Sequence, residues 1–273
     1  MPSLFAPPPP GIYENTEIIT FHFTDSSTPA SLSDEATEVG RVWASTLQAY
    51  LEIEQTGMVW WALVHGAPQK AELFIDWKTA EGREKYEASP ESEALRGAWN
   101  LVTSSPVHKA VYRFPHDDVA RQAGLCSTSD TVSAHFTFKF NDGLGSSSDA
   151  GQWDAVFAQF ATGVMGSPGG VVATSATYGW ELNHDSYTAA FRYLNIEAMQ
   201  SFLQENDASQ LLEQLRSRAT GGIEIEFLET RLFSHGWLGS VDKTRPENPA
   251  TTAMFAEARN IFGGVNSSIV RGE

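Results

Sequence analysis

The chain has 273 residues, of which 34 are acidic and 18 basic, so its formal net charge at pH 7 is −16. This charge argues against a nucleic-acid partner, which needs clustered lysine and arginine, and it disfavours docking on an anionic membrane. With 41% hydrophobic and 11% aromatic residues, the composition is typical of a globular protein with a substantial core.

The cysteine content, the N-terminal segment and the lack of long apolar runs indicate the cellular compartment of the protein. Cys126 is the only cysteine, which excludes a disulfide within the chain and a cluster of thiolate metal ligands. The proline-rich first 14 residues lack the basic stretch and apolar core of a signal peptide, and they are predicted to form an extended tail. No run approaches the roughly 20 apolar residues that a membrane-spanning helix needs. These features predict a cytoplasmic protein without a membrane partner.

Two segments with the same alternation indicate an internal repeat. Residues 18–24 place Ile19, Phe21 and Phe23 on one side of a predicted strand and polar residues on the other. Residues 131–140 alternate in the same way, and the tripeptide His-Phe-Thr occurs in both segments, at 22–24 and at 135–137. A tripeptide match is weak by itself, so the elements that follow must also agree.

The following elements agree in type and order. The first copy is predicted to contain a helix that begins with a capping box at 31–34, strands at 58–65 and 71–77, a helix at about 80–101 and a strand at 107–114. The second copy is predicted to contain a helix after 148–149, strands at 170–182 and 187–194, a helix at 196–218 and a strand at 223–233. Each copy therefore has the order β-α-β-β-α-β, the split βαβ plan.

This order predicts an α+β fold of two tandem ferredoxin-like units that pack sheet against sheet. A four-stranded sheet with both helices on one face leaves its other face uncovered, and a second sheet from the same chain can cover it. The predicted segments are a tail (1–14), a first repeat (15–120), a linker (121–130), a second repeat (131–234) and a C-terminal extension (235–273). A short amphipathic helix at 252–262 is expected to close over the sheets or to mediate a homodimer.

With this element order, the sequence resembles the dimeric α+β barrel superfamily, as a tandem within one chain. That superfamily includes antibiotic-biosynthesis monooxygenases, stress-responsive A/B barrel proteins and polyketide cyclases such as olivetolic acid cyclase. The resemblance covers about residues 15–234. Besides element order it depends on a histidine in the first strand of each copy (His22, His135), a helix break at Ser89-Pro90, and His108 at the start of the fourth strand.

The resemblance carries expectations about the site. It implies a ligand cavity between sheet and helices, and a reaction that needs no metal or nucleotide cofactor. It implies a catalytic histidine at His108 in the first copy, because Phe227 stands at the matching position of the second. Some relatives bind haem through a single histidine, but no residue here is singled out for that role. We therefore expect no cofactor.

Histidine and tyrosine are the candidate acid–base residues, because histidine titrates near neutral pH and tyrosine can donate to a developing enolate oxygen. The predicted catalytic residues are His22, His65, Tyr86, His108 and His135. The predicted substrate-binding residues are Trp43, Tyr50, Trp60, Tyr112, Tyr178 and Arg192. A histidine on the polar side of a strand is more often structural than catalytic, and the tryptophans fit core positions equally well. No metal-binding spacing such as His-Glu-x-x-His occurs, so no metal site is predicted.

The leading hypothesis is a cofactor-independent enzyme of specialised metabolism. It would act on a hydrophobic polyketide- or terpenoid-like molecule as a cyclase, isomerase, lyase or decarboxylase, with His108 or His22 as the base. One alternative is cofactor-free monooxygenation. The other is a non-catalytic small-molecule-binding or stress-response protein, because a fold does not determine a function.

Overall fold

The structure, a computed structural model, describes residues 13–24, 29–32, 34, 36–114, 121, 124–126, 131–141, 147–166 and 175–231. These residues divide into two compact units: a first unit formed by residues 13–111 with 230–231, and a second unit formed by 112–229, so that the last two residues of the strand at 108–113 belong to the second unit. Nearly all of the predicted tail, most of the predicted linker and the whole C-terminal extension, including the helix at 252–262, lie outside the described residues.

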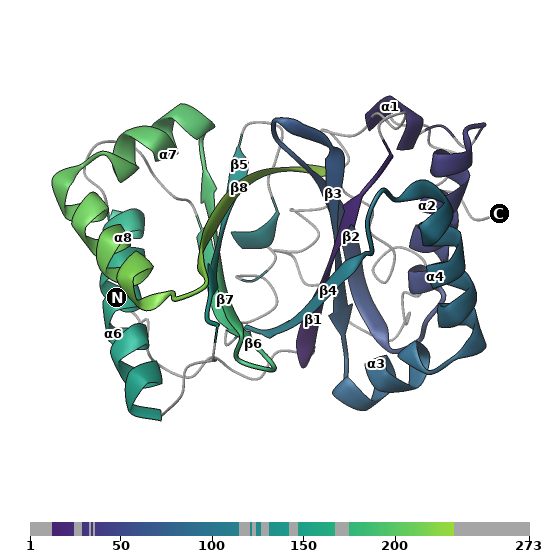
Figure 1. The fold of residues 1–273 in the computed structure, drawn as a ribbon, viewed down its shortest axis with the longest axis horizontal. Helices are drawn as coiled ribbons and strands as arrows, with labels where there is room; N and C mark the ends of the chain where they lie inside the picture. The colour runs from purple at the N-terminus through teal and green to yellow at the C-terminus, as the bar shows by residue number, and fades with distance from the viewer. Residues whose placement is uncertain are drawn as a thin grey trace, which may run out of the picture. The chain divides into compact units, whose positions relative to one another are not determined.

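The first unit has the predicted element order, with a short helix added before the first long helix and the second helix divided in two (Figure 1). Its elements are β1 (Asn15–His22), α1 (Pro29–Leu32), α2 (Glu38–Leu51), β2 (Thr56–Val64), β3 (Ala67–Trp77), α3 (Ala80–Glu87), α4 (Pro90–Val102) and β4 (His108–Arg113). The strand order is β4-β1-β3-β2. β1 runs antiparallel to β3 along its whole length, from Asn15 opposite Trp77 to His22 opposite Lys70. This is the ferredoxin-like plan that the sequence predicts.

The second unit repeats the plan. Its elements are β5 (Val132–Lys139), α6 (Ser147–Gly166), β6 (Ser175–Glu181), β7 (Ser186–Tyr193), α7 (Ile196–Leu203), α8 (Asn206–Arg218) and β8 (Gly222–Arg231). The strand order is β8-β5-β7-β6, which matches the order in the first unit. The last two residues of β4, Tyr112 and Arg113, pair with Glu181 and Trp180 of β6. The predicted α+β class and the tandem of two ferredoxin-like units are therefore confirmed.

The predicted capping box at 31–34 is wrong. Ser31 and Leu32 belong to the short helix α1, and α2 begins later, after Thr37. The Thr37 hydroxyl accepts a hydrogen bond from the backbone N–H of Gly40 at 3.0 Å. A threonine in extended conformation before a helix satisfies one of the free N–H groups of the first turn, which is why α2 starts at Glu38.

Each predicted long second helix is two helices. In the first unit, Pro90 begins α4 because it lacks a backbone N–H, and the Ser89 side chain accepts a hydrogen bond from the N–H of Ser92 at 3.1 Å. In the second unit, α7 ends at Leu203 and α8 begins at Asn206, without a side-chain cap. The Ser-Pro pattern indicated the first break, and no comparable pattern marks the second.

The core of the first unit lies between its helices and one side of its sheet. On β1, the ring of Phe21 packs edge-on against Trp43 of α2 and Trp99 of α4, with 5.1 Å between centroids in both pairs. Side chains alternate along a strand, so the side of β1 that carries Phe21 faces the helices. The same alternation places Asn15 and Glu17 on this helix-facing side, among the core residues.

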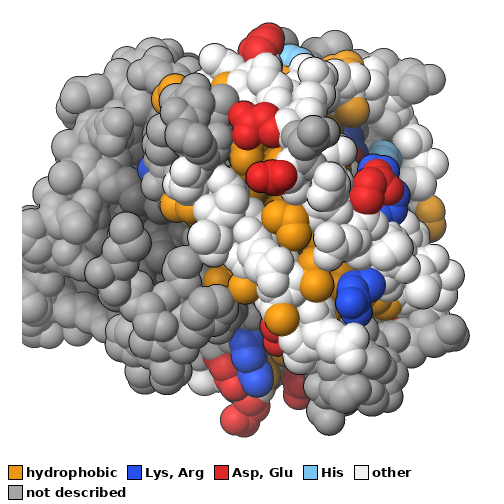
Figure 2. All heavy atoms as spheres, turned by 90° about the vertical axis from the view of Figure 1, so that its left-hand side faces the viewer, with side chains coloured by type: hydrophobic (Ala, Val, Ile, Leu, Met, Phe, Trp, Pro, Cys, Tyr) orange, Lys and Arg blue, Asp and Glu red, His pale blue; other side chains and the backbone are white. Residues whose placement is uncertain are grey.

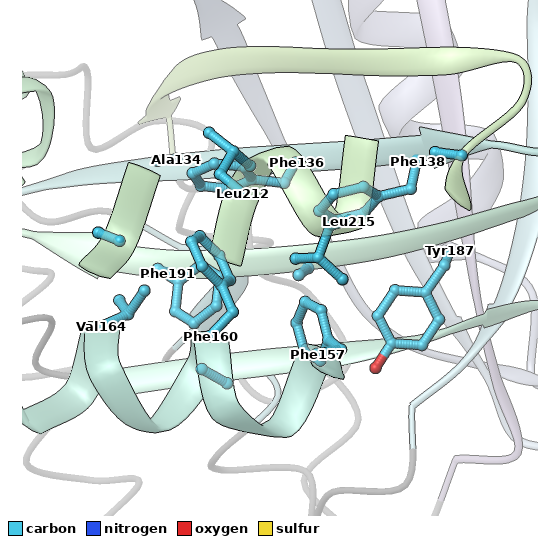
Figure 3. Packing of buried hydrophobic residues seen from close by; sticks show 14 of the residues in the cluster. Ala134, Phe136, Phe138, Phe157, Phe160, Val164, Tyr187, Phe191, Leu212 and Leu215 are labelled. Atoms are coloured by element: carbon cyan, nitrogen blue, oxygen red, sulfur yellow. The ribbon is translucent and has the colours of Figure 1, made fainter. Parts of the chain in front are cut away.

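The second unit has a core of its own, rich in aromatic rings (Figure 3). Phe136 of β5 and Phe191 of β7 meet edge to face, with 5.7 Å between their centroids. Phe160 of α6 packs on both, and Leu212 and Leu215 come from α8. Such edge-to-face contacts add to the free energy gained by burying apolar surface.

The surface on the side of the second unit that carries α6, α7 and α8 is mixed in character. Figure 2 shows acidic, basic and small apolar areas interspersed on it. Among the described residues, no helix is both long enough and apolar enough to cross a membrane.

Candidate active site

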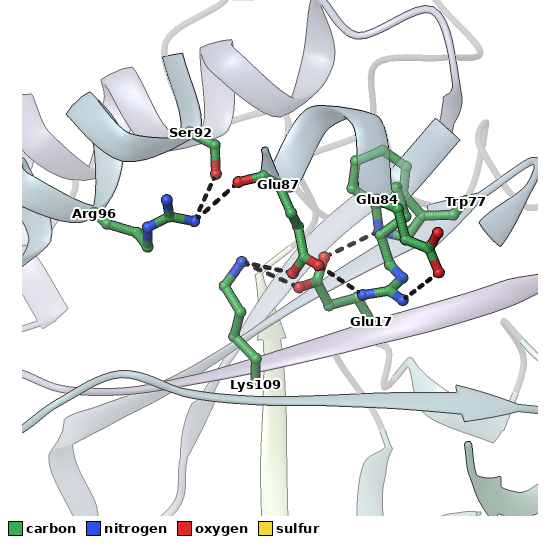
Figure 4. Close-up of polar contacts among 8 residues, drawn as sticks. Glu17, Trp77, Glu84, Glu87, Ser92, Arg96 and Lys109 are labelled. Carbon is green, nitrogen blue, oxygen red and sulfur yellow. Dashed lines mark hydrogen bonds and ion pairs between the residues drawn. The ribbon is translucent and has the colours of Figure 1, made fainter. Parts of the chain in front are cut away.

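A buried glutamate stands at the centre of the polar residues in the first unit. The side chain of Glu17 on β1 is fully buried on the helix-facing side of the sheet. Its Oε2 accepts a hydrogen bond of 3.0 Å from Nε1 of Trp77, the last residue of β3. Its Oε1 forms an ion pair with Nζ of Lys109 on β4, at 3.2 Å, and has no other partner among the residues that the structure describes. Figure 4 shows these contacts.

The pKa of Glu17 is raised above its ordinary value. Burial is the main cause, because a carboxylate loses its hydration in the interior. Lys109 opposes this rise by its positive charge, Glu87 of α3 adds to it by its negative charge, and the indole N–H of Trp77 opposes it again. A carboxyl whose pKa moves toward neutrality can both take up and release a proton, which is the requirement for acid–base catalysis.

Two tyrosine hydroxyls lie close to this carboxyl. Tyr50 of α2 and Tyr86 of α3 have ring centroids 5.4 Å apart, and both rings pack against Trp77 at 6.3 and 5.9 Å. Both hydroxyl oxygens are buried, and neither has a hydrogen-bond partner among the described residues. Burial, followed by the charge of Glu17, raises the pKa of Tyr50 well above its ordinary value and that of Tyr86 to about 12. Both hydroxyls therefore keep their protons at neutral pH and can donate them in hydrogen bonds.

Asn15 adds a third polar group on the same side of β1. Its side chain is 1% exposed, and neither its amide nitrogen nor its amide oxygen has a hydrogen-bond partner within the described part of the chain. Buried polar groups in native proteins are almost always hydrogen-bonded, so exceptions that gather in one place call for a physical reason. Asn15, Tyr50 and Tyr86 together offer donors and acceptors beside the Glu17 carboxyl.

Three of the predicted catalytic histidines are exposed. His22 ends β1, on the side of the strand opposite Phe21 and Glu17. His65 lies in the turn between β2 and β3, and His108 begins β4. The structure therefore places these side chains outside the buried group around Glu17, while Tyr50 and Tyr86 from the predicted set lie within it.

The predicted tryptophans of the first unit occupy two different environments. Trp43 belongs to the helix-facing core, where its ring meets Trp61 at 5.3 Å between centroids. Trp60 lies on the other side of β2 and stacks on Phe74 of β3, with 5.2 Å between centroids and 4° between planes. Both are buried, and the indole N–H of each has no hydrogen-bond partner in the described chain.

The predicted residues of the second unit form separate groups. The Tyr112 hydroxyl lies 2.9 Å from Oγ of Ser186, which donates to Oε2 of Glu181 at 2.7 Å. Tyr178 of β6 is half-buried; burial and the charge of Asp154 raise its pKa. Asp154 lies on α6, where burial raises its own pKa and a hydrogen bond with Trp180 opposes the rise. Arg192 of β7 is half-buried, opposite Ser133 of β5.

His135 is a buried, neutral histidine. Its side chain is 5% exposed, on the side of β5 away from Phe136, and burial lowers its pKa to about 4, partly opposed by a backbone hydrogen bond with Leu125. Gly124, next to Leu125, accepts a hydrogen bond from the Ser133 hydroxyl at 2.8 Å and leaves no room for a side chain, because a Cβ atom there would lie 2.6 Å from the backbone nitrogen of Thr177. This linker segment therefore packs tightly against the second sheet.

His135 predicts a loss of stability in acid. Its pKa in the folded state, about 4, is below the ordinary histidine value of 6.5 that applies after unfolding, so the unfolded chain binds the proton first as the pH falls. The contribution of His135 is fully present above pH 6.5 and should be lost between about 6.5 and 4, by about 3 kcal/mol. Urea unfolding at several pH values measures it. His135→Asn should flatten the curve in this window; an unchanged curve in this variant would contradict the assignment.

Sequence reasoning missed Glu17, Asn15 and Lys109. The predicted strand begins at residue 18 and so leaves out Glu17. Extending its alternation one position toward the N-terminus places Glu17 on the same side of the strand as Phe21. Lys109 gave no signal beyond its position next to His108. Within the described ranges, no three His, Cys, Asp or Glu side chains lie close enough to hold a metal ion.

The comparisons with known proteins identify the fold. No protein-family model and no curated protein matches the sequence. A solved structure described as an anthrone oxidase-like protein matches 82% of this chain and 94% of its own, with a TM-score of 0.59 and 13% identity. A putative monooxygenase from Fusobacterium nucleatum matches the same shares, with a TM-score of 0.52 and 7% identity. The chain has the dimeric α+β barrel fold.

A single chain supplies both ferredoxin-like units of this dimeric α+β barrel, as the sequence predicts. The two solved chains are matched over nearly their whole length, so each also carries both units in one chain. At such low identity the likeness concerns the fold, and the activities in those descriptions are those of the other proteins.

Proposed function

We propose that the first unit is the catalytic part of a cofactor-independent enzyme that takes a proton from a hydrophobic, polyketide- or terpenoid-like small molecule. In this proposal Glu17 is the base, and the hydroxyls of Tyr50 and Tyr86 stabilise the oxygen that becomes negative. The supporting observation is a fully buried carboxyl beside two buried hydroxyls that lack partners among the described residues. Unpaired polar groups in the interior cost folding free energy, and a ligand that pairs with them would account for their presence.

The first chemical step is the same for every outcome considered. The Glu17 carboxylate takes a proton from an acidic C–H or phenolic O–H group, and the electron pair of the broken bond moves to the substrate's oxygen as an enolate or phenolate. Hydrogen bonds from the tyrosine hydroxyls stabilise that charge where water is excluded. The anion can then attack a carbonyl and cyclise, regain the proton at another carbon and isomerise, or expel a leaving group from the β-carbon, which departs with the electron pair of its bond. In a decarboxylation the Glu17 carboxylate would instead take the proton of the substrate's own carboxylic acid, and the electron pair left by the departing carbon dioxide would form the enolate that the tyrosine hydroxyls stabilise.

Cofactor-free monooxygenation is a second candidate, and the fold likeness to an anthrone oxidase-like protein at a TM-score of 0.59 favours it. Here the substrate anion reduces molecular oxygen directly. A methylene group becomes a carbonyl, one oxygen atom enters the product, and the other leaves as water with the two hydrogens. The same base and the same hydroxyls would serve both candidates, and oxygen uptake distinguishes them.

The first unit is the better candidate for this chemistry because it holds the buried carboxyl groups. Among the described residues, the buried acidic side chains are Glu17, Glu72 and Asp76, all in this unit. The buried polar residues of the second unit are Arg121, Ser133, His135, Thr177, Ser186 and Thr188, and none of them is a carboxylic acid.

A dihydroxyanthrone, a flat phenolic ketone with an acidic methylene group, is a suitable probe. In oxygen-free heavy water, the full-length protein should accelerate deuterium exchange at that methylene. This exchange measures the first step, proton removal, by itself. In air, oxygen uptake with quinone formation would indicate the monooxygenase. Binding, seen as quenched tryptophan fluorescence, without exchange or turnover would mean that the chain is a binding protein, contrary to the proposal.

Replacing Tyr50 by phenylalanine should separate function from stability. Removal of a buried hydroxyl that has no partner within the described part of the chain is expected to stabilise the fold by about 1 kcal/mol. The same change should lower the exchange rate by about tenfold, because one of two donors to the enolate oxygen is lost. Urea unfolding and the deuterium-exchange assay give the two values. A loss of stability together with unchanged exchange would indicate a structural hydroxyl.

The predicted catalytic histidines supply the alternative base. If His22 or His108 removes the proton, then His22→Ala or His108→Ala should lower exchange while Glu17→Gln does not. His65→Ala and His135→Ala complete the series, since the histidine hypothesis covers all four positions. The opposite pattern, with loss confined to Glu17→Gln, is the one that the proposal predicts.

A further inference from the structure

One lysine contacts two carboxyl groups in the first unit (Figure 4). Nζ of Lys109 lies 3.2 Å from Oε1 of Glu17 and 3.4 Å from Oε1 of Glu87. The Lys109 side chain is 20% exposed, between the fully buried Glu17 and the 30% exposed Glu87. Nζ also lies 5.5 Å from the centroid of the Trp99 ring, a cation–π contact that holds the ammonium group in place.

Glu87 is itself held from two directions. Nη1 of Arg83, one turn earlier on α3, donates to Oε2 of Glu87 at 2.9 Å. Nη1 of Arg96 on α4 donates to the backbone oxygen of Glu87 at 3.3 Å and to Oγ of Ser92 at 3.1 Å. The Glu87 carboxylate therefore has a fixed place next to Lys109 whichever partner the lysine favours.

We propose that Lys109 is a positioning residue that is shared between Glu17 and Glu87, so that Glu17 can gain and lose a proton without leaving an unbalanced charge in the interior. The inference builds on the proposed function, in which Glu17 is the base. It assigns Lys109 and Glu87 roles that act through Glu17, with no direct contact to the substrate.

The reasoning follows from the cost of buried charge. When Glu17 is ionised, Lys109 is its counter-ion, at 3.2 Å. When Glu17 takes the substrate's proton, its charge disappears, and a lysine with no other partner would be left as an uncompensated charge at the edge of the core. Glu87, at 3.4 Å, balances the lysine in that state. The trio thus has an ion pair in both protonation states, and proton transfer requires only a small shift of Nζ.

The charged and titratable groups around Glu17 come from each element packed against it. Tyr50 faces it from α2, Tyr86 and Glu87 from α3, and Lys109 from β4, while β3 contributes the indole of Trp77. Of these, Lys109 and Glu87 act on the pKa of Glu17 through their charges. The two act in opposite directions: Lys109 lowers the pKa of Glu17, and Glu87 raises it.

The test is a carbon-13 NMR titration of the Glu17 carboxyl in the full-length, ligand-free protein, with the signal assigned from its absence in Glu17→Gln. Lys109→Met should raise the pKa of Glu17 and Glu87→Gln should lower it. Lys109→Arg, which keeps the charge, should restore a value close to that of the unsubstituted protein. If Lys109→Met does not fold, Glu87→Gln, which changes a partly exposed side chain, still decides. If neither variant changes the pKa of Glu17, or if both change it in the same direction, the inference is overturned.

Deuterium exchange of the anthrone probe against pH separates this inference from the proposed function. The acidic limb of the profile should move to higher pH in Lys109→Met and to lower pH in Glu87→Gln. Opposite NMR shifts without any exchange in the unsubstituted protein would uphold the shared lysine and refute the enzyme. Exchange in the unsubstituted protein with a profile that neither variant moves would uphold the enzyme and refute the shared lysine.

Discussion

Glu17→Gln is expected to lower proton removal from the anthrone probe by about 10²- to 10⁴-fold, the range over which general acid–base groups contribute. Glutamine has nearly the same shape as glutamate, can still accept the hydrogen bond from the Trp77 indole, and cannot take up a proton. The expected loss is in the rate of the chemical step, with little change in probe affinity. Deuterium exchange and fluorescence quenching, measured on the same samples, give both quantities.

Glu72→Gln is the matched control for this prediction. Glu72 is buried on β3 of the same sheet, but it alternates with Leu73, which faces the helices, so its side chain lies on the other side. The control variant makes the same chemical change at a similar depth and should keep the exchange rate. An equal loss of exchange in both variants would show that the effect is structural, and full exchange in Glu17→Gln would refute Glu17 as the base.

The fold could be predicted from the sequence because its evidence is local and repeated. Alternation around Phe21 and again around Phe136 identified the first strand of each unit, and the order of the later elements confirmed the repeat. The start of α2 is predicted wrongly because two positions in the sequence could cap a helix there. Thr37, rather than a serine at 31, caps α2, because the short helix α1 precedes it.

The candidate site could be predicted only in part. Tyr50 and Tyr86 were selected because tyrosine can donate to an enolate oxygen, and both lie next to the buried carboxyl. Glu17 and Lys109 belong to β1 and β4, far apart in the sequence, and their ion pair depends on the neighbouring positions of those strands in the sheet. Which polar residues of a strand are buried also depends on the folded structure. The sequence pattern of β1 does not reveal that His22 is exposed and Glu17 is buried.

Trp153→Ala is expected to destabilise the chain by about 3–5 kcal/mol, the cost of removing a large aromatic side chain from a core. Trp153 of α6 is fully buried. Its ring meets Phe138 and Phe140 at 5.0 Å and Tyr187 at 5.5 Å between centroids, all close to edge-on, and such pairs contribute beyond their buried area. Its indole N–H has no hydrogen-bond partner among the described residues, so the loss measures packing alone.

Met165→Ala on the same helix is the control for this substitution, because Met165 is 38% exposed and its truncation should change stability by only about 0.5 kcal/mol. Urea unfolding followed by far-UV circular dichroism compares the two variants. If Trp153→Ala lowered the free energy of unfolding by less than about 1 kcal/mol, the surrounding rings would have moved to fill the cavity, contrary to this prediction. The dense aromatic contacts make such a rearrangement unfavourable. Because Trp153 lies in the second unit and Glu17 in the first, Trp153→Ala protein that remains folded should still catalyse exchange. Stability and catalysis would then depend on different units of one chain.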